Sequence, residues 1–298
     1  MSPSIPFATL SDELAKRIQF LPDKPEETPE STLRALWLTA TGQPVSPERA
    51  ATVELATLSA AQSELLRQLI ERRVSGIPLA HITQRQSFMG LELLASAEAL
   101  VPRKETELLA RAAIEKASLI AAERGACTVI DVCTGSGNNA LAVAHHVPST
   151  RVFASDLSEP ALKLARDNAH HLDLTQRVEF RAGDLLQPFQ GEAFLGQVDL
   201  LTCNPPYISS AGVARMPAEI SAHEPRLAFD GGPLGIGILM RLVREAPSFL
   251  RAGGWLAFEV GSGQGPGLLK RMQANASFKE VIAINDASGT IRVLLAHL

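Results

Sequence analysis

The tetrapeptide Asn204-Pro205-Pro206-Tyr207 offers several hydrogen-bond acceptors and few donors that could occupy them. Neither proline has an amide hydrogen, so the carbonyl oxygens of the segment are left to face a ligand. Asn204 adds a side-chain carbonyl, and Tyr207, the single tyrosine of the chain, adds an aromatic face that can stack on a flat group. The segment is therefore expected to bind a planar amide or amine.

The same tetrapeptide suggests a reaction at the bound nitrogen. An amide nitrogen is a weak nucleophile because its lone pair is delocalised into the carbonyl, and acceptors that hold both N–H bonds can align the remaining electron density with an electrophilic carbon. The proton that the nitrogen then loses can leave to Asn204, to a loop carbonyl or to water. The expected catalytic residues are Asn204, Pro205 and Tyr207, and the expected substrate contacts are Asn204, Pro205, Pro206, Tyr207 and Glu224. For Glu224 two roles remain open, namely orienting the Asn204 loop or pinning the segment that follows it.

Three acidic residues follow three apolar runs at the places where a nucleoside would be held. Asp131 precedes a turn with glycines at 135 and 137, which let the backbone bend sharply and approach a ligand. Asp156 comes about 20 residues after that turn and can accept hydrogen bonds from two ribose hydroxyls. Asp184 can accept from an exocyclic amine such as that of adenine.

The glycine pattern alone leaves two cofactors open. Gly135-x-Gly137-x-x-Ala140 followed by Asp156 also fits a dinucleotide fingerprint, so a nicotinamide-binding protein is a competing interpretation. Asp131 favours S-adenosylmethionine, because an acid suits the cationic amino group of a methionine tail and repels a pyrophosphate. S-adenosylhomocysteine would then be the product. The expected cofactor-binding residues are Asp131, Thr134, Gly135, Gly137, Asp156, Leu157, Asp184, Leu185 and Asn204.

The elements that carry these residues alternate between strand and helix. Apolar runs at 128–132, 151–155, 178–181, 198–202 and 254–260 predict strands, and the patterns at 159–172 and 235–250, with one more after Glu105, predict helices. Such alternation predicts a doubly wound, mostly parallel α/β sheet covered on both faces, with ligands bound at the carboxyl ends of the strands.

The first part of the chain has a different pattern. Three short amphipathic helices are expected, one capped near Ser11, one with Thr28 as cap and Pro29 in its first turn, and one with a capping box of Ser59 and Gln62. The third would bury Leu65, Leu66, Leu69, Ile70 and Val74. Phe88, Leu91, Leu93 and Leu94 around Gly90 predict a β-hairpin. We expect a helical substrate-recognition domain at 1–76, a linker hairpin at 77–103 and a methyltransferase domain at 104–298.

Composition excludes several classes of function. The net charge of −4 comes without a cluster of Lys and Arg, so stable nucleic-acid binding is not expected. No apolar run approaches the roughly 18 residues of a membrane span, and the chain is expected to be cytoplasmic. Cys127, Cys133 and Cys203 lack paired spacing, which predicts reduced thiols and no metal site.

Over nearly its whole length the chain resembles the HemK-like protein-(glutamine-N5) methyltransferases. The matching segments are 76–82, 101–107, 204–208, 223–228 with Gly231-Gly232, and 258–261 with Gly263-Gln264-Gly265. The resemblance implies a class I methyltransferase fold with a seven-stranded sheet, S-adenosylmethionine as donor, and glutamine-binding roles for Asn204, Pro205 and Tyr207. The best-known members modify the Gly-Gly-Gln loop of peptide chain release factors, so the helical domain is expected to recognise a protein.

Some residues depart from the family pattern. Lys104 stands where a proline is usual, Asn138-Asn139 extend the glycine turn, and His81 replaces a common tyrosine. The segment 133–137 is more similar to the branch that methylates ribosomal protein uL3. The acceptor therefore stays open among a release factor, another protein such as uL3, and a small-molecule amide or amine.

Overall fold

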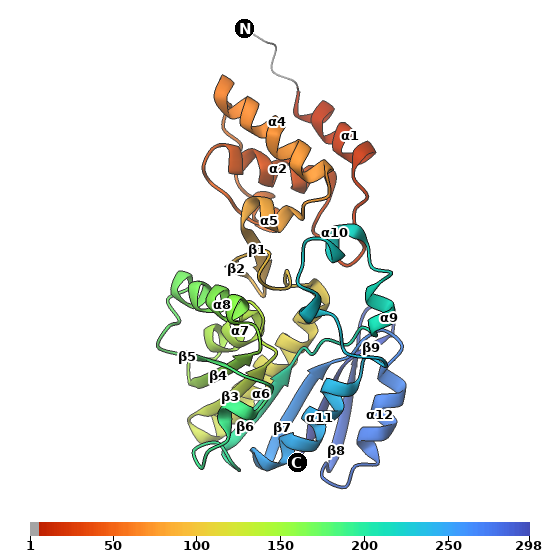
Figure 1. Ribbon diagram of the computed structural model, residues 1–298. Helices are drawn as coiled ribbons and strands as arrows, with labels where there is room; N and C mark the ends of the chain where they lie inside the picture. Colours follow the sequence, from red (N-terminus) through yellow and green to blue (C-terminus); the bar gives the residue numbers. More distant parts are fainter. Residues whose placement is uncertain (1–5) are drawn as a thin grey trace. The chain divides into compact units, whose positions relative to one another are not determined.

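The computed structural model describes residues 6–298, which fold into two compact units (Figure 1). The helical unit contains the described residues up to Ala97, together with Val101–Lys104 and Pro217–Glu224. The sheet unit contains Glu98–Leu100, Glu105–Met216 and Pro225–Leu298. The expected division at residues 76 and 103 stays a prediction. None of the helices in the described part of the chain is long and apolar enough to cross a bilayer.

The sheet unit is built on seven strands in the order β5-β4-β3-β6-β7-β9-β8. Their bounds are β3 Cys127–Val132, β4 Thr150–Asp156, β5 Val178–Ala182, β6 Val198–Cys203, β7 Leu250–Glu259, β8 Glu280–Asn285 and β9 Ile291–His297. Strands β3 to β7 pair in parallel, whereas β9 is antiparallel to both β7 and β8. The expected mostly parallel seven-stranded sheet is confirmed, and so are the five strands expected from apolar runs.

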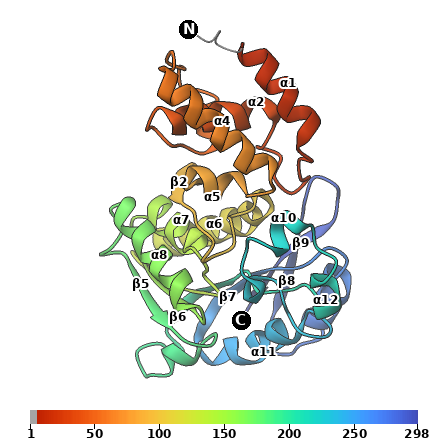
Figure 2. The same ribbon diagram turned by 45° about the horizontal axis from the view of Figure 1, so that its top comes forward.

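Helices cover both faces of this sheet. Figure 2 shows α6 (Glu107–Arg124), α7 (Asn138–His146) and α8 (Glu159–His171) on one side, and α11 (Gly237–Glu245) and α12 (Gly265–Gln273) on the other. The short helix α9 (Ser210–Val213) and the 3-10 turns Gln187–Phe189, Arg226–Ala228 and Ala246–Ser248 complete the unit, and a further 3-10 turn, Lys104–Thr106, precedes α6. The helix expected over 235–250 is shorter than predicted. It ends at Glu245 because Pro247 lies in the 3-10 turn that follows and cannot donate to a preceding carbonyl.

The helical unit packs five helices ahead of a hairpin. These are α1 (Phe7–Arg17), α2 (Pro29–Ala40), α3 (Pro47–Ala50), α4 (Ala60–Val74) and α5 (Leu79–Thr83), followed by the antiparallel strands β1 (Arg85–Phe88) and β2 (Leu91–Leu94). The predicted hairpin is confirmed. The hydrophobic core of the helical unit joins the apolar sides of α1, α2 and α4, including Leu14, Leu33, Leu36, Leu69 and Ile70.

Local signals explain which helix predictions held. The Thr28 and Ser59 capping boxes form as expected and start α2 and α4. The prediction of a start near Ser11 is wrong: α1 begins at Phe7 after Pro6 and has no side-chain cap. Leu65 was expected in the core but is 41% exposed, because it lies off the apolar stripe that buries Leu66 and Leu69. The short helices α3 and α5 were not predicted, since four or five residues give no periodicity.

A buried cluster of charges joins a late segment of the chain to the helical unit. Lys24 donates to Glu219 at 2.9 Å, and Arg73 donates to Glu219 at 2.9 Å and to Glu27 at 3.0 Å. Glu219 lies in α10 (Ala218–Ser221). Burial raises the pKa of Glu27, whereas for Glu219 the attraction of Lys24 and Arg73 outweighs burial and lowers the pKa. The cluster therefore holds Pro217–Glu224 through Glu219, which pairs with both Lys24 and Arg73.

Candidate active site

The parallel register brings four side chains that were predicted to accept hydrogen bonds from a ligand to one edge of the sheet. Asp131 is paired with Ala154 on β4, and Asp156 ends β4 opposite Ala182 on β5. Asn204 follows β6, whose last residue Cys203 is paired with Val132. Asp184 comes two residues after β5. The carboxyl ends of β3, β4, β5 and β6 thus gather the residues that the sequence pointed to.

The turn after β3 is held in unusual backbone geometry. Cys133, Gly135 and Gly137 have positive φ angles of 57°, 55° and 82°. A Cβ at Gly137 would lie 3.2 Å from the Cβ of Ala165, so the turn also packs closely against α8. A non-glycine residue such as Cys133 at positive φ is a strained conformation of the kind that gathers at ligand sites.

Asp156 fastens this turn to β4. One carboxylate oxygen accepts from the amide of Gly135 at 2.9 Å, and the other accepts from the amide of Ser158 at 2.9 Å. Burial raises the pKa of Asp156, although the amides of Ser158, Gly135 and Leu157 oppose the rise by donating to its charged form. The carboxylate therefore shapes the turn and stands at its edge.

Asp131 lies deeper than its neighbour. Its side chain is 1% exposed and accepts from the hydroxyls of Thr134 at 2.5 Å and Thr202 at 2.6 Å. Burial raises its pKa to about 6, while the two threonine hydrogen bonds act in the opposite direction. The acid is thus ionised only above mildly acidic pH, and it also fixes the Thr134 hydroxyl of the turn.

The remaining expected cofactor residues have mixed exposure. Asp184 forms an ion pair with Arg241 of α11, and its expected contact with an exocyclic amine stays a prediction. Leu157 is 56% exposed directly after Asp156. Leu185 is 3% exposed and has a φ of 51°, the second non-glycine residue at positive φ along this edge.

Two buried polar atoms of the turn lack partners within residues 6–298. These are the hydroxyl oxygen of Ser136 and the side-chain carbonyl oxygen of Asn139, in side chains that are 2% and 4% exposed. A buried polar atom without a hydrogen bond costs about 1–3 kcal/mol, so such atoms are rare unless a ligand or solvent satisfies them. The turn therefore has the unpaired polar groups of a binding site.

The acceptor motif is fixed by side chains from two other elements, the 3-10 turn Lys104–Thr106 and strand β7. The Asn204 amide donates to the hydroxyl of Thr106 at 3.2 Å. The Tyr207 hydroxyl lies 3.1 Å from a carboxylate oxygen of Glu259 and 3.3 Å from one of Glu105. Burial and the two nearby carboxylates raise the pKa of Tyr207 well above its usual value. Tyr207 is therefore a neutral hydrogen-bond donor at physiological pH.

Three glycines surround the motif, and we call them the glycine cage. A Cβ at Gly231 would lie 2.4 Å from the carbonyl oxygen of Pro206, and one at Gly235 would lie 2.2 Å from that of Tyr207. A Cβ at Gly261 would lie 2.9 Å from the Tyr207 ring. The Tyr207 carbonyl also accepts from the side-chain amide of Gln264 at 2.9 Å, so it is not among the acceptors available to a ligand.

Glu224 lies in the helical unit and has buried partners there. Its carboxylate accepts from the Arg103 guanidinium at 2.6 Å and from the Val101 amide at 2.9 Å. Arg103 also contacts Asp23 at 3.1 Å. Both roles considered for Glu224, and its contact with substrate, stay predictions.

Sequence reasoning gave no role to Glu105, Thr106, Glu259 or Arg292, which form the surroundings of the acceptor motif. The first three belong to the segments 101–107 and 258–261, whose resemblance to a family was a signal that they matter. Arg292 contacts Glu105 at 2.7 Å from the start of β9, and no pattern in the sequence singled it out.

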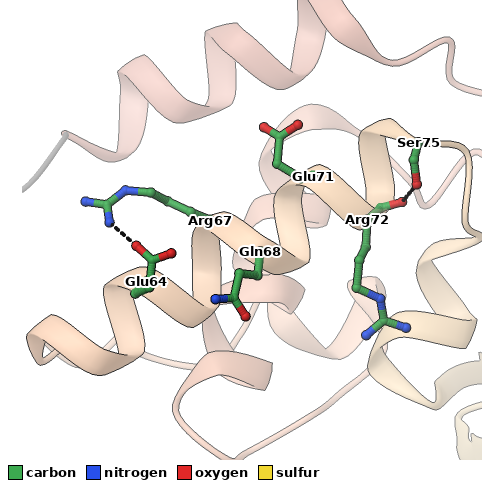
Figure 3. A pocket seen from close by; sticks show the side chains of 6 residues that line it. All are labelled: Glu64, Arg67, Gln68, Glu71, Arg72 and Ser75. Carbon is green, nitrogen blue, oxygen red and sulfur yellow. Dashed lines mark hydrogen bonds and ion pairs between the residues drawn. The ribbon is translucent and has the colours of Figure 1, made fainter.

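Other parts of the described chain show no second centre of this kind. Residues 6–298 contain no group of three His, Cys, Asp or Glu side chains that could hold a metal ion, and all three cysteines are free thiols. A surface hollow of about 420 Å³ lies along α4 and is lined by Glu64, Arg67, Gln68, Glu71, Arg72 and Ser75 (Figure 3). Arg67 pairs with Glu64 at 2.8 Å there, and both side chains are about half exposed.

Comparison with known proteins identifies relatives across both units. Residues 14–83 match the PrmC N-terminal domain, and residues 129–223 match a methyltransferase domain. The release factor glutamine methyltransferase of Moorella thermoacetica is 38% identical over 230 residues, covering 77% of this chain and 78% of the relative. That of Thermodesulfovibrio yellowstonii is 30% identical over 238 residues, covering 80% and 82%.

Solved structures share the fold. The catalytic domain of hMettl16 in complex with the MAT2A 3′UTR hairpin 6 has a TM-score of 0.53 at 16% sequence identity, covering 76% of this chain and 81% of that chain. At this identity the likeness concerns the fold alone.

Proposed function

Because the chain belongs to the family of release factor glutamine methyltransferases, we propose that it methylates the side-chain N5 of a glutamine in a peptide chain release factor. The family membership agrees with the resemblance drawn from the sequence motifs. The observation that carries the proposal is the position of Asn204-Pro205-Pro206-Tyr207 directly after β6, on the strand next to the one that carries the glycine turn. One motif would hold the acceptor and the other the donor.

The donor is S-adenosylmethionine, whose sulfonium makes its methyl carbon electrophilic. The residues present fit this cofactor, because the glycine turn has strained backbone, a carboxylate at its edge and buried polar atoms without partners. In our proposal Asp156 binds the ribose hydroxyls and Asp131 attracts the amino group of the methionine tail. Leu157 and Leu185 supply apolar contacts, Asp184 accepts from the adenine amine, and Thr134, Gly135 and Gly137 form the turn. The match to a methyltransferase domain and the methyltransferase relatives disfavour the competing nicotinamide interpretation.

On the acceptor side, the chain's own residues hold the glutamine side chain still. The Asn204 side-chain carbonyl and the Pro205 main-chain carbonyl would accept the two hydrogens of the amide NH2, and Tyr207 would stack on the amide plane. Holding a weak nucleophile in line with its electrophile supplies much of the rate, because it replaces a costly bimolecular encounter with a positioned one. The proton lost by the nitrogen leaves through Asn204, Pro205 or water.

The names of the relatives favour a release factor over the other acceptors considered, which were ribosomal protein uL3 and a small-molecule amide or amine. Translation factors act in the cytoplasm, so the proposal places the reaction there. The helical unit, whose residues 14–83 match the N-terminal domain of the family, would contact the protein acceptor.

The test is transfer of an isotopically labelled methyl group into a purified release factor, with a matched factor whose Gly-Gly-Gln glutamine is replaced by glutamate. Label in the first and none in the second is the expected result. We further expect that Asn204→Ala removes most of the turnover but leaves the affinity for S-adenosylhomocysteine, measured by calorimetry, nearly unchanged. Label that appears in both factors, or full turnover by Asn204→Ala, would contradict the proposal.

A further inference from the structure

Behind the acceptor motif lies a buried carboxylate to which neither the sequence nor the proposed reaction gives a role. Glu259 ends β7, is 1% exposed and contacts the Tyr207 hydroxyl at 3.1 Å. Arg292 approaches the same carboxylate oxygen at 3.8 Å and forms a closer pair with Glu105 at 2.7 Å. Two acids and one base thus meet near the tyrosine hydroxyl. Burying the charge of Glu259 costs free energy that a cation 3.8 Å away offsets only in part, so this carboxylate calls for an explanation.

Thr106 connects this carboxylate to the other end of the motif. Its hydroxyl oxygen accepts from the Asn204 amide nitrogen at 3.2 Å, and the same hydroxyl acts on Glu259 so as to lower the pKa of that carboxyl. The second carboxylate oxygen of Glu259 is buried and lacks a hydrogen-bond partner among the described residues, so it can accept the Thr106 hydrogen. A threonine hydroxyl has one hydrogen. When that hydrogen is donated to the Glu259 carboxylate, the oxygen can only accept from Asn204, so the nitrogen end of the Asn204 amide faces Thr106.

This hydrogen-bond direction determines what Asn204 offers to a ligand. With its nitrogen held by Thr106, the amide presents its carbonyl oxygen on the remaining side. A carbonyl is the end required to accept from a substrate NH2 group, whereas the reversed amide would place donor against donor. The orientation of a single side-chain amide therefore decides whether the motif can bind its acceptor.

We propose that Glu259 is a positioning residue, which acts through Thr106 to set the orientation of the Asn204 amide and through Tyr207 to hold the aromatic ring. The inference rests on the proposed function, because it specifies how that acceptor site is kept in its working arrangement. Glu259 touches neither reactant in this scheme.

The charge of Glu259 gives the device a pH dependence. Burial raises its pKa to about 7 and Glu105 adds to the rise, while the hydrogen bonds of Thr106 and Tyr207 and the charge of Arg292 act against it. Above this pH the carboxylate only accepts, and Thr106 keeps the Asn204 nitrogen. Below it, the carboxyl proton can be donated to Thr106, whose own hydrogen can then turn to the Asn204 carbonyl. Turnover should therefore rise as the pH increases through 7.

The decisive variant is Glu259→Gln, which has nearly the same shape but carries an NH2 group that mimics the protonated acid. We expect kcat to fall about 10²-fold, in line with a small misplacement of a reacting group. The affinity for S-adenosylhomocysteine should stay the same, and the rise in kcat near pH 7 should be lost. Thr106→Val should lower kcat similarly, and Thr106→Ser, which restores the hydroxyl, should recover it. Glu280→Gln removes an exposed acid from β8 and serves as the control.

A second measurement needs no substrate. Tyr207 is the only tyrosine, so protein labelled with ¹³C-tyrosine gives the ring signals of one residue. We expect these signals to shift in a step near pH 7 in the unaltered protein and in Glu280→Gln, and the step to vanish in Glu259→Gln.

These measurements separate the inference from the proposed function. If the unaltered protein fails to methylate a release factor, the proposed function falls, but the tyrosine titration still reports on Glu259. The inference is overturned if Glu259→Gln keeps its kcat and its pH dependence, if it weakens cofactor affinity as much as turnover, or if the tyrosine step persists without the carboxylate.

Discussion

In the buried charge cluster of the helical unit, we expect that replacing one carboxylate oxygen by an amide nitrogen causes a large loss of stability. Glu219→Gln removes a carboxylate that accepts from Lys24 and from Arg73, both at 2.9 Å. The side chain of Glu219 is 10% exposed, that of Lys24 2% and that of Arg73 1%. The cluster of two acids and two bases is then left with one unpaired positive charge. Breaking a buried pair costs about 3–5 kcal/mol. We expect about 3 kcal/mol, because Glu27 still lies 3.0 Å from Arg73 and 3.9 Å from Lys24.

The matched control is the same substitution in an exposed pair of the same unit. Glu64 and Arg67 are joined at 2.8 Å, but their side chains are 59% and 48% exposed. Glu64→Gln should cost about 0.5 kcal/mol or less, because water screens an exposed pair and its ordering costs entropy. Because the chemical change is identical, the difference between the two losses of unfolding free energy reports the effect of burial.

The assay is urea unfolding followed by tryptophan fluorescence. Trp37 lies in α2 of the helical unit and Trp255 in β7 of the sheet unit, so a Trp255→Phe background isolates the signal of the helical unit. This separation matters because a chain of two units need not unfold in one step. The midpoint for Glu219→Gln should fall well below those of the parent and of Glu64→Gln.

A pH series supplies a further check on the reasoning. Lys24 and Arg73 lower the pKa of Glu219 despite its burial, so its contribution to stability is fully present above its usual pKa of 4.5 and is lost as the pH falls through the lower folded value. The difference between Glu219→Gln and the parent should therefore shrink in acid. Equal costs for Glu219→Gln and Glu64→Gln, or a difference that grows in acid, would refute the assignment.

Two further predictions concern the cofactor turn. Asp156→Ala removes two charge-assisted hydrogen bonds to backbone amides. It should weaken S-adenosylhomocysteine binding, measured by calorimetry, about 10- to 100-fold, the equivalent of about 1.5–3 kcal/mol, with little change in kcat at saturation. Unchanged affinity would argue against the proposed role of Asp156. Burial raises the pKa of Asp131 to about 6, so binding of the cationic ligand should tighten as the pH rises from 5 to 7, and Asp131→Asn should bind weakly without this trend; a trend that survives in Asp131→Asn would assign it to another group.

The meeting of Asp131, Asp156 and Asn204 at one edge of the sheet could be predicted because parallel strands leave a local signature in the sequence. Buried strands such as β3 and β6 are continuous apolar runs, and the residues that follow them must meet at one edge. Strands β8 and β9 were not among the expected strands, although each contains a short apolar run, at 281–284 and 293–296. Side-chain partners far apart in the chain were also out of reach, since nothing local indicates that Glu224 pairs with Arg103 or that Thr106 holds Asn204.

At the proposed acceptor site, the glycine cage limits how the preference for an acceptor can be redesigned. At Gly231 and Gly235 any added carbon would collide with backbone oxygens at 2.4 and 2.2 Å, and these cannot rotate away as a flexible side chain could. A mutagenesis library aimed at new acceptors would therefore lose its functional members at these positions. Variation that leaves the protein working must come from side chains that border the proposed acceptor site without touching the main chain of the motif.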